Sequence, residues 1–178
     1  MRPQTLRPTA LILAAAAGSI AAPALAADLT VTVEVPTIST AAYHRPYVAV
    51  WIEQQDTAQT AVRTIALWYE AGDTARGEGT GEQYLKDIRT WWRKGGRAMA
   101  LPIDGITGPT RAPGRQTVTV PGARLASLPA GSYNIVVEAA REQGGREVVR
   151  VPFRWGAANT GAGTGSTELG AVRVAVSR

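Results

Sequence analysis

The residues of this sequence best suited to chemistry lie in one short segment, Asp104-Gly105-Ile106-Thr107-Gly108-Pro109-Thr110. It offers one carboxylate and two hydroxyl groups among glycines and a proline. Gly, Pro and Thr also gather wherever a β-hairpin turns, so an ordinary surface turn is the competing interpretation. No other segment points to a particular chemistry, so the functional prediction depends on this one.

The segment is similar to the sequence that FAD:protein FMN transferases modify. That acceptor sequence is Asp-x-x-Ser/Thr-Gly-Ala-Thr, and its last hydroxyl is esterified to the FMN phosphate. By this resemblance Thr110 is the attachment residue for covalent FMN, and the transferase recognises Asp104, Thr107 and Gly108. Pro109 departs from the pattern, which has Ala there. Since proline fixes its own φ and pushes Gly108 toward extended backbone, modification of this chain stays an alternative.

Other catalytic arrangements lack the residues they need. The chain has one histidine, His44, and no cysteine, so Ser-His-Asp, Cys-His and His-rich metal sites are absent or rest on a single residue. We expect His44 to be structural or exposed, because no partner is spaced to orient it as a base. Asp73, Glu78 and Glu82 lack the regular alternation of a calcium loop. We therefore expect neither an enzyme nor a metal site.

The first 26 residues have the pattern of a cleavable secretory signal. Arg2 and Arg7 precede an apolar run over residues 10–20, and Ala24-Leu25-Ala26 offers small residues for cleavage. The apolar run is too short to span a bilayer, and no later segment is long enough. The sequence thus predicts a periplasmic protein with one domain over residues 27–178 and no transmembrane segment.

Charge and cysteine content narrow the partners. Loss of residues 1–26 lowers the formal net charge from +5 to +3. The remaining arginines are scattered along the chain instead of being concentrated in one basic stretch, so we do not expect nucleic acid as a partner. A cysteine-free chain in an oxidising compartment must be stabilised by packing alone.

Alternating apolar residues predict an all-β fold. Residues 29–35 alternate as a half-buried strand does, and residues 47–52 are apolar on both faces, as in a covered central strand. Further strands are predicted at 62–69, 116–120, 132–139, 146–155 and 169–177. Seven or eight such strands favour an immunoglobulin-like antiparallel β-sandwich. The glycine-rich stretch 157–166 is predicted to be a mobile loop.

One amphipathic helix is predicted over residues 82–94, because its apolar residues recur at helical spacing and Gly95-Gly96 follows. Trp91 and Trp92 are adjacent and point about 100° apart, so they cannot share the centre of one buried stripe. Either both cover the sandwich core, or one forms a stacking surface for a planar ligand or a partner. Residues 104–115 are predicted to be a long hairpin loop.

Charged residues also cluster over 138–142, at the end of a predicted strand. Pairing with Arg63, Arg146 or Arg150 on a neighbouring strand would explain them structurally. Anion binding is the alternative.

Several segments together resemble one bacterial periplasmic family, domain of unknown function twenty-two seventy-one. The resemblance rests on residues 47–53, 62–68, Tyr84-Leu85, Trp91-Trp92, 105–114 and 138–142. Members are commonly encoded beside PepSY-type membrane proteins and FAD:protein FMN transferases. The resemblance therefore implies an exported, non-catalytic accessory or binding protein of an extracytoplasmic flavin redox system, with these two proteins as candidate partners. The alternative is a covalent FMN carrier, modified at Thr110 and shielded by Trp91 or Trp92.

Overall fold

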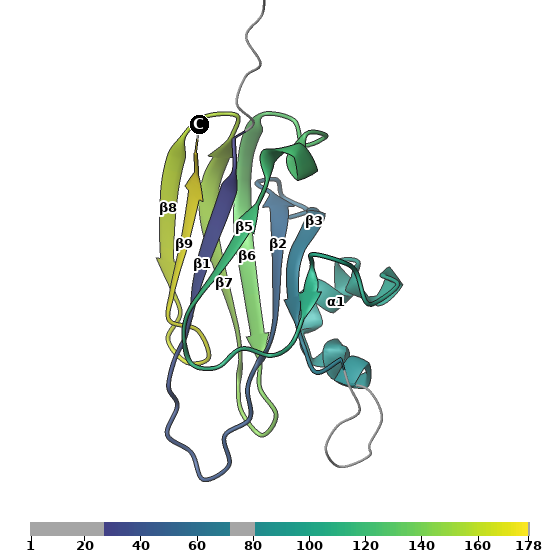
Figure 1. The fold of residues 1–178 in the computed structure, drawn as a ribbon, viewed down its shortest axis with the longest axis vertical. Coiled ribbons are helices and arrows are strands. Elements are labelled where there is room, and N and C mark those ends of the chain that lie inside the picture. The colour runs from purple at the N-terminus through teal and green to yellow at the C-terminus, as the bar shows by residue number, and fades with distance from the viewer. Residues whose placement is uncertain (1–26, 72–80, 178) are drawn as a thin grey trace, which may run out of the picture.

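The computed structural model describes residues 27–71 and 81–177. The predicted signal peptide lies outside the described residues, as do residues 72–80. Within them the chain forms two β-sheets packed face to face (Figure 1). The predicted all-β sandwich is therefore confirmed.

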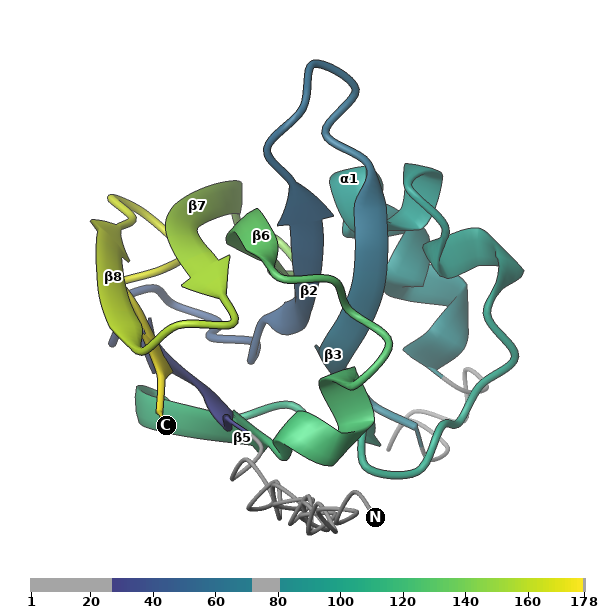
Figure 2. The ribbon, with the colours of Figure 1, turned by 90° about the horizontal axis from the view of Figure 1, so that it is seen from above.

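The two sheets differ in size and in covering (Figure 2). The smaller sheet has the strand order β5 (Gly114–Val120), β1 (Leu29–Val35), β9 (Ala171–Val176), β8 (Asn159–Thr164). The larger sheet has the order β4 (Thr107–Gly108), β3 (Ala61–Trp68), β2 (Tyr47–Gln54), β6 (Gly131–Ala140), β7 (Arg146–Trp155). Neighbouring strands are antiparallel except β3 and β4, which are parallel. A 3-10 helix, η3 (Gly122–Leu125), follows β5.

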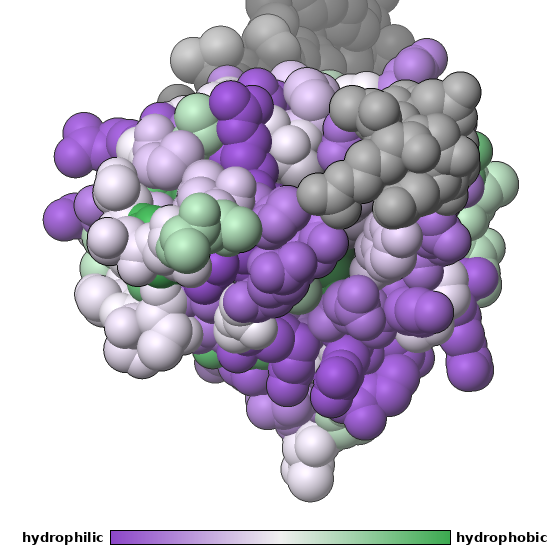
Figure 3. All heavy atoms as spheres, turned by 90° about the horizontal axis from the view of Figure 1, so that it is seen from below, coloured by the Kyte–Doolittle hydropathy of each residue, from purple (hydrophilic) through white to green (hydrophobic). Residues whose placement is uncertain are grey.

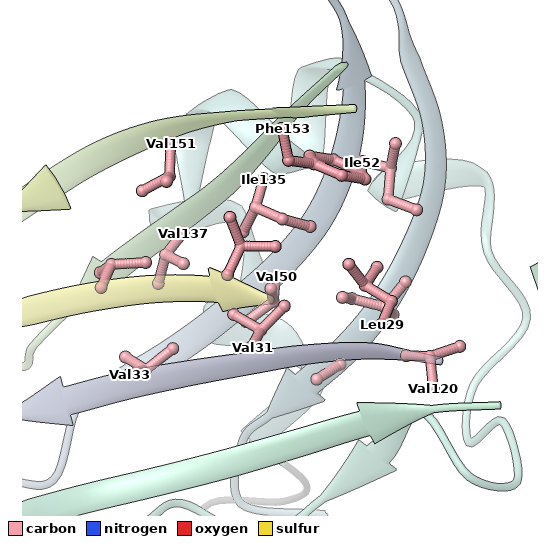
Figure 4. Packing of buried hydrophobic residues seen from close by; sticks show 14 of the residues in the cluster. Leu29, Val31, Val33, Val50, Ile52, Val120, Ile135, Val137, Val151 and Phe153 are labelled. Carbon is pink, nitrogen blue, oxygen red and sulfur yellow. The ribbon is translucent and has the colours of Figure 1, made fainter. Parts of the chain in front are cut away.

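The main core lies between the sheets, as the alternation in β1 predicts. Leu29, Val31 and Val33 are fully buried and face the larger sheet (Figure 4). They pack in one cluster that includes Val50, Ile52, Ile135, Val137, Val151 and Phe153. Each such side chain contributes about 1.5–3 kcal/mol when fully buried. With no disulfide in the chain, this packing is the main source of stability.

A second apolar cluster covers the outer face of the larger sheet. Ala49 and Trp51 of β2 point to this face, and Leu85, Ile88 and Trp91 of the helical segment pack on them. Figure 2 shows this segment outside the larger sheet. Both faces of β2 are therefore covered, as its apolar sequence predicts.

The prediction of one uninterrupted helix over residues 82–94 is wrong. The segment consists of a 3-10 helix η1 (Gly81–Asp87), a short α-helix α1 (Arg89–Arg93) and a 3-10 turn η2 (Gly96–Ala98). Ile88 breaks it with a ψ of 69°. The break frees the backbone N–H groups of Thr90 and Trp91, which donate to the buried Glu138 carboxylate at 3.0 and 2.8 Å. This contact with a distant strand replaces helical hydrogen bonds.

The stretch 157–166 is also not a loop, because residues 159–164 form strand β8 beside β9. Its glycines allow a close approach to β7. A Cβ at Gly163 would lie 3.0 Å from a methyl of Val151, and one at Gly161 would meet both Val151 and the carbonyl of Pro152. Close packing of β8 on β7 therefore requires glycine at these positions. The glycines do not form the mobile loop that the composition predicts.

The predicted loop over residues 104–115 is shorter than expected. The N–H of Leu67 donates to the carbonyl of Ile106 at 2.9 Å, and the N–H of Tyr69 donates to that of Gly108 at 3.0 Å. These bonds make β4 an edge strand, and β5 already begins at Gly114. The loop proper is therefore reduced to residues 109–113.

Candidate functional site

A cavity of about 790 Å³ lies at one end of the sandwich and is bordered by Thr110. Its walls come from the segment before β2, from η1 and α1, and from the turn between β6 and β7. Figure 3 views this end of the molecule, where hydrophilic side chains gather across the middle of the face. The volume falls in the range of small-molecule sites.

A second cavity of about 420 Å³ adjoins the first. Arg45, Glu70 and Thr110 line both cavities. Residues 107–109 line only the smaller one. Thr110 therefore lies at the junction of the two.

The residues of the acceptor-like segment have different environments. The Thr107 hydroxyl donates to the carbonyl of Ile103 at 2.9 Å and accepts from its N–H at 3.1 Å, which closes a turn. Asp104 is exposed and lines neither cavity. Thr110 is half-buried, and no residue within 27–71 or 81–177 forms a hydrogen bond with its hydroxyl. Thr110 is thus the hydroxyl of the segment that is accessible to a ligand.

The two tryptophans lie elsewhere. Trp91 is 2% exposed, and its indole N–H donates to the Thr64 hydroxyl at 3.0 Å. Trp92 is half-buried against it, with ring centroids 6.4 Å apart. Neither ring lines the cavities, so the structure does not bring either one to Thr110. Trp91 belongs to the second apolar cluster.

Three tyrosines supply the aromatic wall of the larger cavity instead: Tyr43, Tyr47 and Tyr84. Tyr47 packs edge-on against Tyr69, with centroids 6.4 Å apart. Burial raises the pKa of Tyr43 and of Tyr47, so both phenols are neutral at physiological pH. The hydroxyl of Tyr43 is buried and has no hydrogen-bond partner among the described residues.

Four arginines line the same cavity, and two of them are already paired. Arg141 binds the buried Glu168 through two hydrogen bonds of 2.8 and 3.1 Å, and these raise the pKa of its guanidinium. Its guanidinium also lies over the ring of Tyr43, 5.9 Å from the centroid. Arg146 binds the buried Glu138 at 2.6 Å. This confirms the pairing of Glu138 with a neighbouring strand predicted from the sequence.

The other two arginines, Arg45 and Arg89, form no ion pair within the described part of the chain. Acidic residues are also present, because Glu70, Asp87 and Glu142 line the cavity. Glu142 lies 3.3 Å from Nδ1 of His44. No group of three or more metal-binding side chains occurs in the residues that the structure describes. The site therefore combines aromatic rings with charges of both signs.

A family model described as "Predicted periplasmic protein (DUF2271)" matches residues 28–171. The chain belongs to this family. Comparisons with curated proteins and with solved structures give no match. The family description supports an exported protein, and no helix in the described ranges is long and apolar enough to cross a membrane.

The sequence does not predict that Tyr43, Tyr47 and Tyr84 line a common cavity. Tyr43 and Tyr47 flank His44-Arg45-Pro46, a dense group of polar and aromatic residues just before a strand. That group was a signal for a site, because loops at strand ends carry binding residues. Its proximity to Tyr84 and Thr110 depends on the three-dimensional fold and could not be read from spacing.

Proposed function

We propose that this exported protein is a non-catalytic binding protein of an extracytoplasmic flavin redox system, and that it binds through the end of the sandwich that carries Thr110. The observation that carries the proposal is the position of Thr110 at the junction of two cavities. The assignment to flavin rests on the similarity of residues 104–110 to the FMN acceptor sequence. The protein supplies a binding surface, and the redox chemistry belongs to the flavin.

The second candidate is covalent attachment of FMN to Thr110. The conformation of Gly108 is compatible with attachment, because this residue already lies in the extended strand β4, and the Thr110 hydroxyl has no partner among the described residues. Pro109 imposes extended backbone on the residue before it, so it is compatible with the loop as it stands. The proline ring is also exposed. Pro109 thus holds the acceptor loop in the shape that β4 gives it.

Attachment is a phosphoryl transfer without redox change. The Thr110 oxygen attacks the FMN phosphorus of FAD, a threonine O–P bond forms, and the P–O bond to the AMP half breaks. AMP leaves, and the hydroxyl proton passes to a base of the transferase. The transferase and FAD are the required co-reactants.

Intact mass spectrometry tests the covalent form. The chain is co-expressed with an FAD:protein FMN transferase, and we expect a mass increase of one FMN less one water. Thr110→Ala removes the increase, whereas Thr117→Ala, at an exposed threonine on β5, keeps it. An unmodified wild-type chain, or an increase that persists in Thr110→Ala, contradicts attachment at this residue.

The binding role is tested separately in membranes of the native host. We expect the tagged chain to retain a PepSY-type or other redox membrane protein, and we expect Arg45→Ala to weaken retention. Recovery of no redox protein above the background of an untagged control contradicts the accessory role.

A further inference from the structure

The larger cavity has the properties of a stacking site. We propose that it binds a planar aromatic ring carrying one compact anionic group, with the ring against Tyr84, Tyr43 and Tyr47 and the anion at Arg45. Identification of that ring as a flavin rests on the proposed function. Binding of an aromatic anion as such rests on the walls of the cavity.

Tyr84 is the first reason. It is 39% exposed, and the described residues contain one other large apolar side chain with comparable exposure, Val62. The next residue, Leu85, is buried against the sheet, so η1 directs Tyr84 away from the apolar cluster. A planar ligand in the cavity would cover the Tyr84 ring. Stacking on aromatic rings suits any flat π system and needs no specific hydrogen bonds.

The other two tyrosines of the cavity are held by contacts with their neighbours. Tyr47 is fixed by its edge contact with Tyr69. Tyr43 is backed by Arg141, which the buried Glu168 holds with two hydrogen bonds. A preorganised wall loses little side-chain entropy when a ligand binds, so it favours affinity.

Tyr43 contributes its ring, and not its hydroxyl, to the site. The hydroxyl is buried within the protein and has no partner among the described residues, so a ligand in the cavity does not reach it. The residue as a whole is half-buried and lines the cavity. Its ring therefore adds to the aromatic surface that a flat ligand would contact.

The charged residues of the cavity indicate what charge the ligand carries. Arg45 lies at the junction beside Thr110 and forms no ion pair with the described residues, so its guanidinium can bind a phosphate or carboxylate. Glu70 shares the junction, and Asp87 lines the larger cavity. These two carboxylates disfavour ligands with many negative charges. The site thus fits a single anionic group attached to a ring.

Fluorescence titration tests the proposal on the exported chain, residues 27–178, made without a transferase. The probes are FMN, which has a ring and an anion, and riboflavin, which has the same ring without phosphate. We expect both to bind with quenching of flavin emission. Tyr84→Ala should weaken both by roughly tenfold, in line with the usual contribution of aromatic stacking. Arg45→Ala should weaken FMN severalfold and leave riboflavin unchanged.

Val62→Ala is the matched control, because it shortens the other exposed apolar side chain on a strand that does not line the cavity. Its affinities should equal those of the wild type. Absence of binding at millimolar flavin, or equal losses in Tyr84→Ala and Val62→Ala, overturns the proposal.

The Thr110→Ala chain separates the stacking site from covalent attachment. Retained riboflavin binding by the Thr110→Ala chain supports a stacking site that does not depend on attachment. A wild-type chain that binds riboflavin but takes no covalent FMN from the transferase supports the stacking site and counts against the carrier. Covalent FMN at Thr110 whose emission is unquenched and insensitive to Tyr84→Ala supports the carrier and overturns the stacking site.

Discussion

Two polar regions next to the larger sheet differ in whether their charged groups have partners within the protein. Under α1, the carboxylates of Glu53 and Glu138 are fully buried and fully bound. Glu53 accepts from Lys94 at 2.9 Å and from Arg150 at 3.0 Å. Glu138 accepts from Arg146 and from two backbone N–H groups of the helical segment. We call the two carboxylates and the groups that donate to them the helix clamp: Glu53, Glu138, Lys94, Arg146, Arg150 and the N–H groups of Thr90 and Trp91.

In the cavity at the end of the sandwich, several polar groups stay unbound within the described structure. Arg45 and Arg89 have no ion pair there, and the hydroxyl of Tyr43 has no hydrogen-bond partner there. The bound buried groups fix the geometry of the clamp. Arg45 and Arg89 are exposed, so their guanidinium groups can bind a ligand. Arg146 connects the regions, because it belongs to the clamp and lines the cavity. Arg146, held by the buried Glu138, is therefore a fixed part of the cavity wall.

The largest expected effect lies in the clamp. Glu138→Ala removes the partner of Arg146 and leaves the N–H groups of Thr90 and Trp91 without an acceptor. Each donor left without its acceptor costs about 1–3 kcal/mol, so the two N–H groups together predict a loss of about 2–6 kcal/mol. Urea unfolding at neutral pH should show a loss of this size. Asp104→Asn, at an exposed carboxylate, should change stability by less than about 0.5 kcal/mol. Equal losses in both variants would show that the partners of Glu138 do not account for its effect.

The clamp also shows why part of the fold could not be predicted from the sequence. The two sheets follow from local alternation, since strands such as β1 bury every second residue. The break at Ile88 does not, because it depends on Glu138, which is distant in the chain and joins the helical segment through backbone hydrogen bonds. Similarly, the sequence around Gly161 and Gly163 is typical of a flexible loop. Only the position of β7 beside them explains why these residues are glycines.

The candidate site was predictable only in part. The acceptor-like segment directed attention to Thr110, and Thr110 borders the cavities. The aromatic partners expected for it, Trp91 and Trp92, lie outside them. Helical spacing does not reveal which face of η1 meets the loop before β2, so the sequence does not predict Tyr84 as a site residue. Contacts between segments distant in sequence decide the site, and periodicity does not encode them.

An intermediate effect is expected at Glu147, a bound carboxylate next to Arg146. Desolvation by burial would raise its pKa, but hydrogen bonds from the N–H groups of Ser166, Leu169 and Thr167 and from the Ser166 hydroxyl lower the pKa to about 2. Its unfolded pKa is near 4.5, so its stabilising contribution is present above that pH and is lost as the pH falls from about 4.5 to 2.

Glu147→Gln should therefore cost about 1–3 kcal/mol at neutral pH. The difference in unfolding free energy from the wild type should shrink as the pH falls through this range. Urea unfolding of both chains at several pH values measures it. A difference that stays constant from neutral pH down to about pH 3 would show that the carboxylate charge is not what holds the 166–169 backbone.

A smaller effect of opposite sign is expected at Tyr43, in the cavity. Tyr43→Phe removes a buried hydroxyl that has no partner in the described structure, and it keeps the ring over Arg141. Stability should stay equal or rise by up to about 1 kcal/mol, because an unfavourable buried polar group is lost. A loss of stability comparable to that of Glu138→Ala would show that the Tyr43 hydroxyl stabilises the fold, as the carboxylates of the clamp do.

The smallest effect on stability is expected at Arg45, and it gives the sharpest contrast with the clamp. Arg45 is exposed, and without an ion pair among the described residues its loss leaves no buried charge unpaired. Arg45→Ala should therefore change the unfolding free energy by less than about 0.5 kcal/mol. Arg150→Ala, which removes one of the two cations bound to Glu53, should cost more because a buried carboxylate loses a partner. If Arg45→Ala destabilises the chain as much as Arg150→Ala does, the arginine at the junction serves the fold. A stable Arg45→Ala chain with weakened FMN affinity assigns it to the ligand.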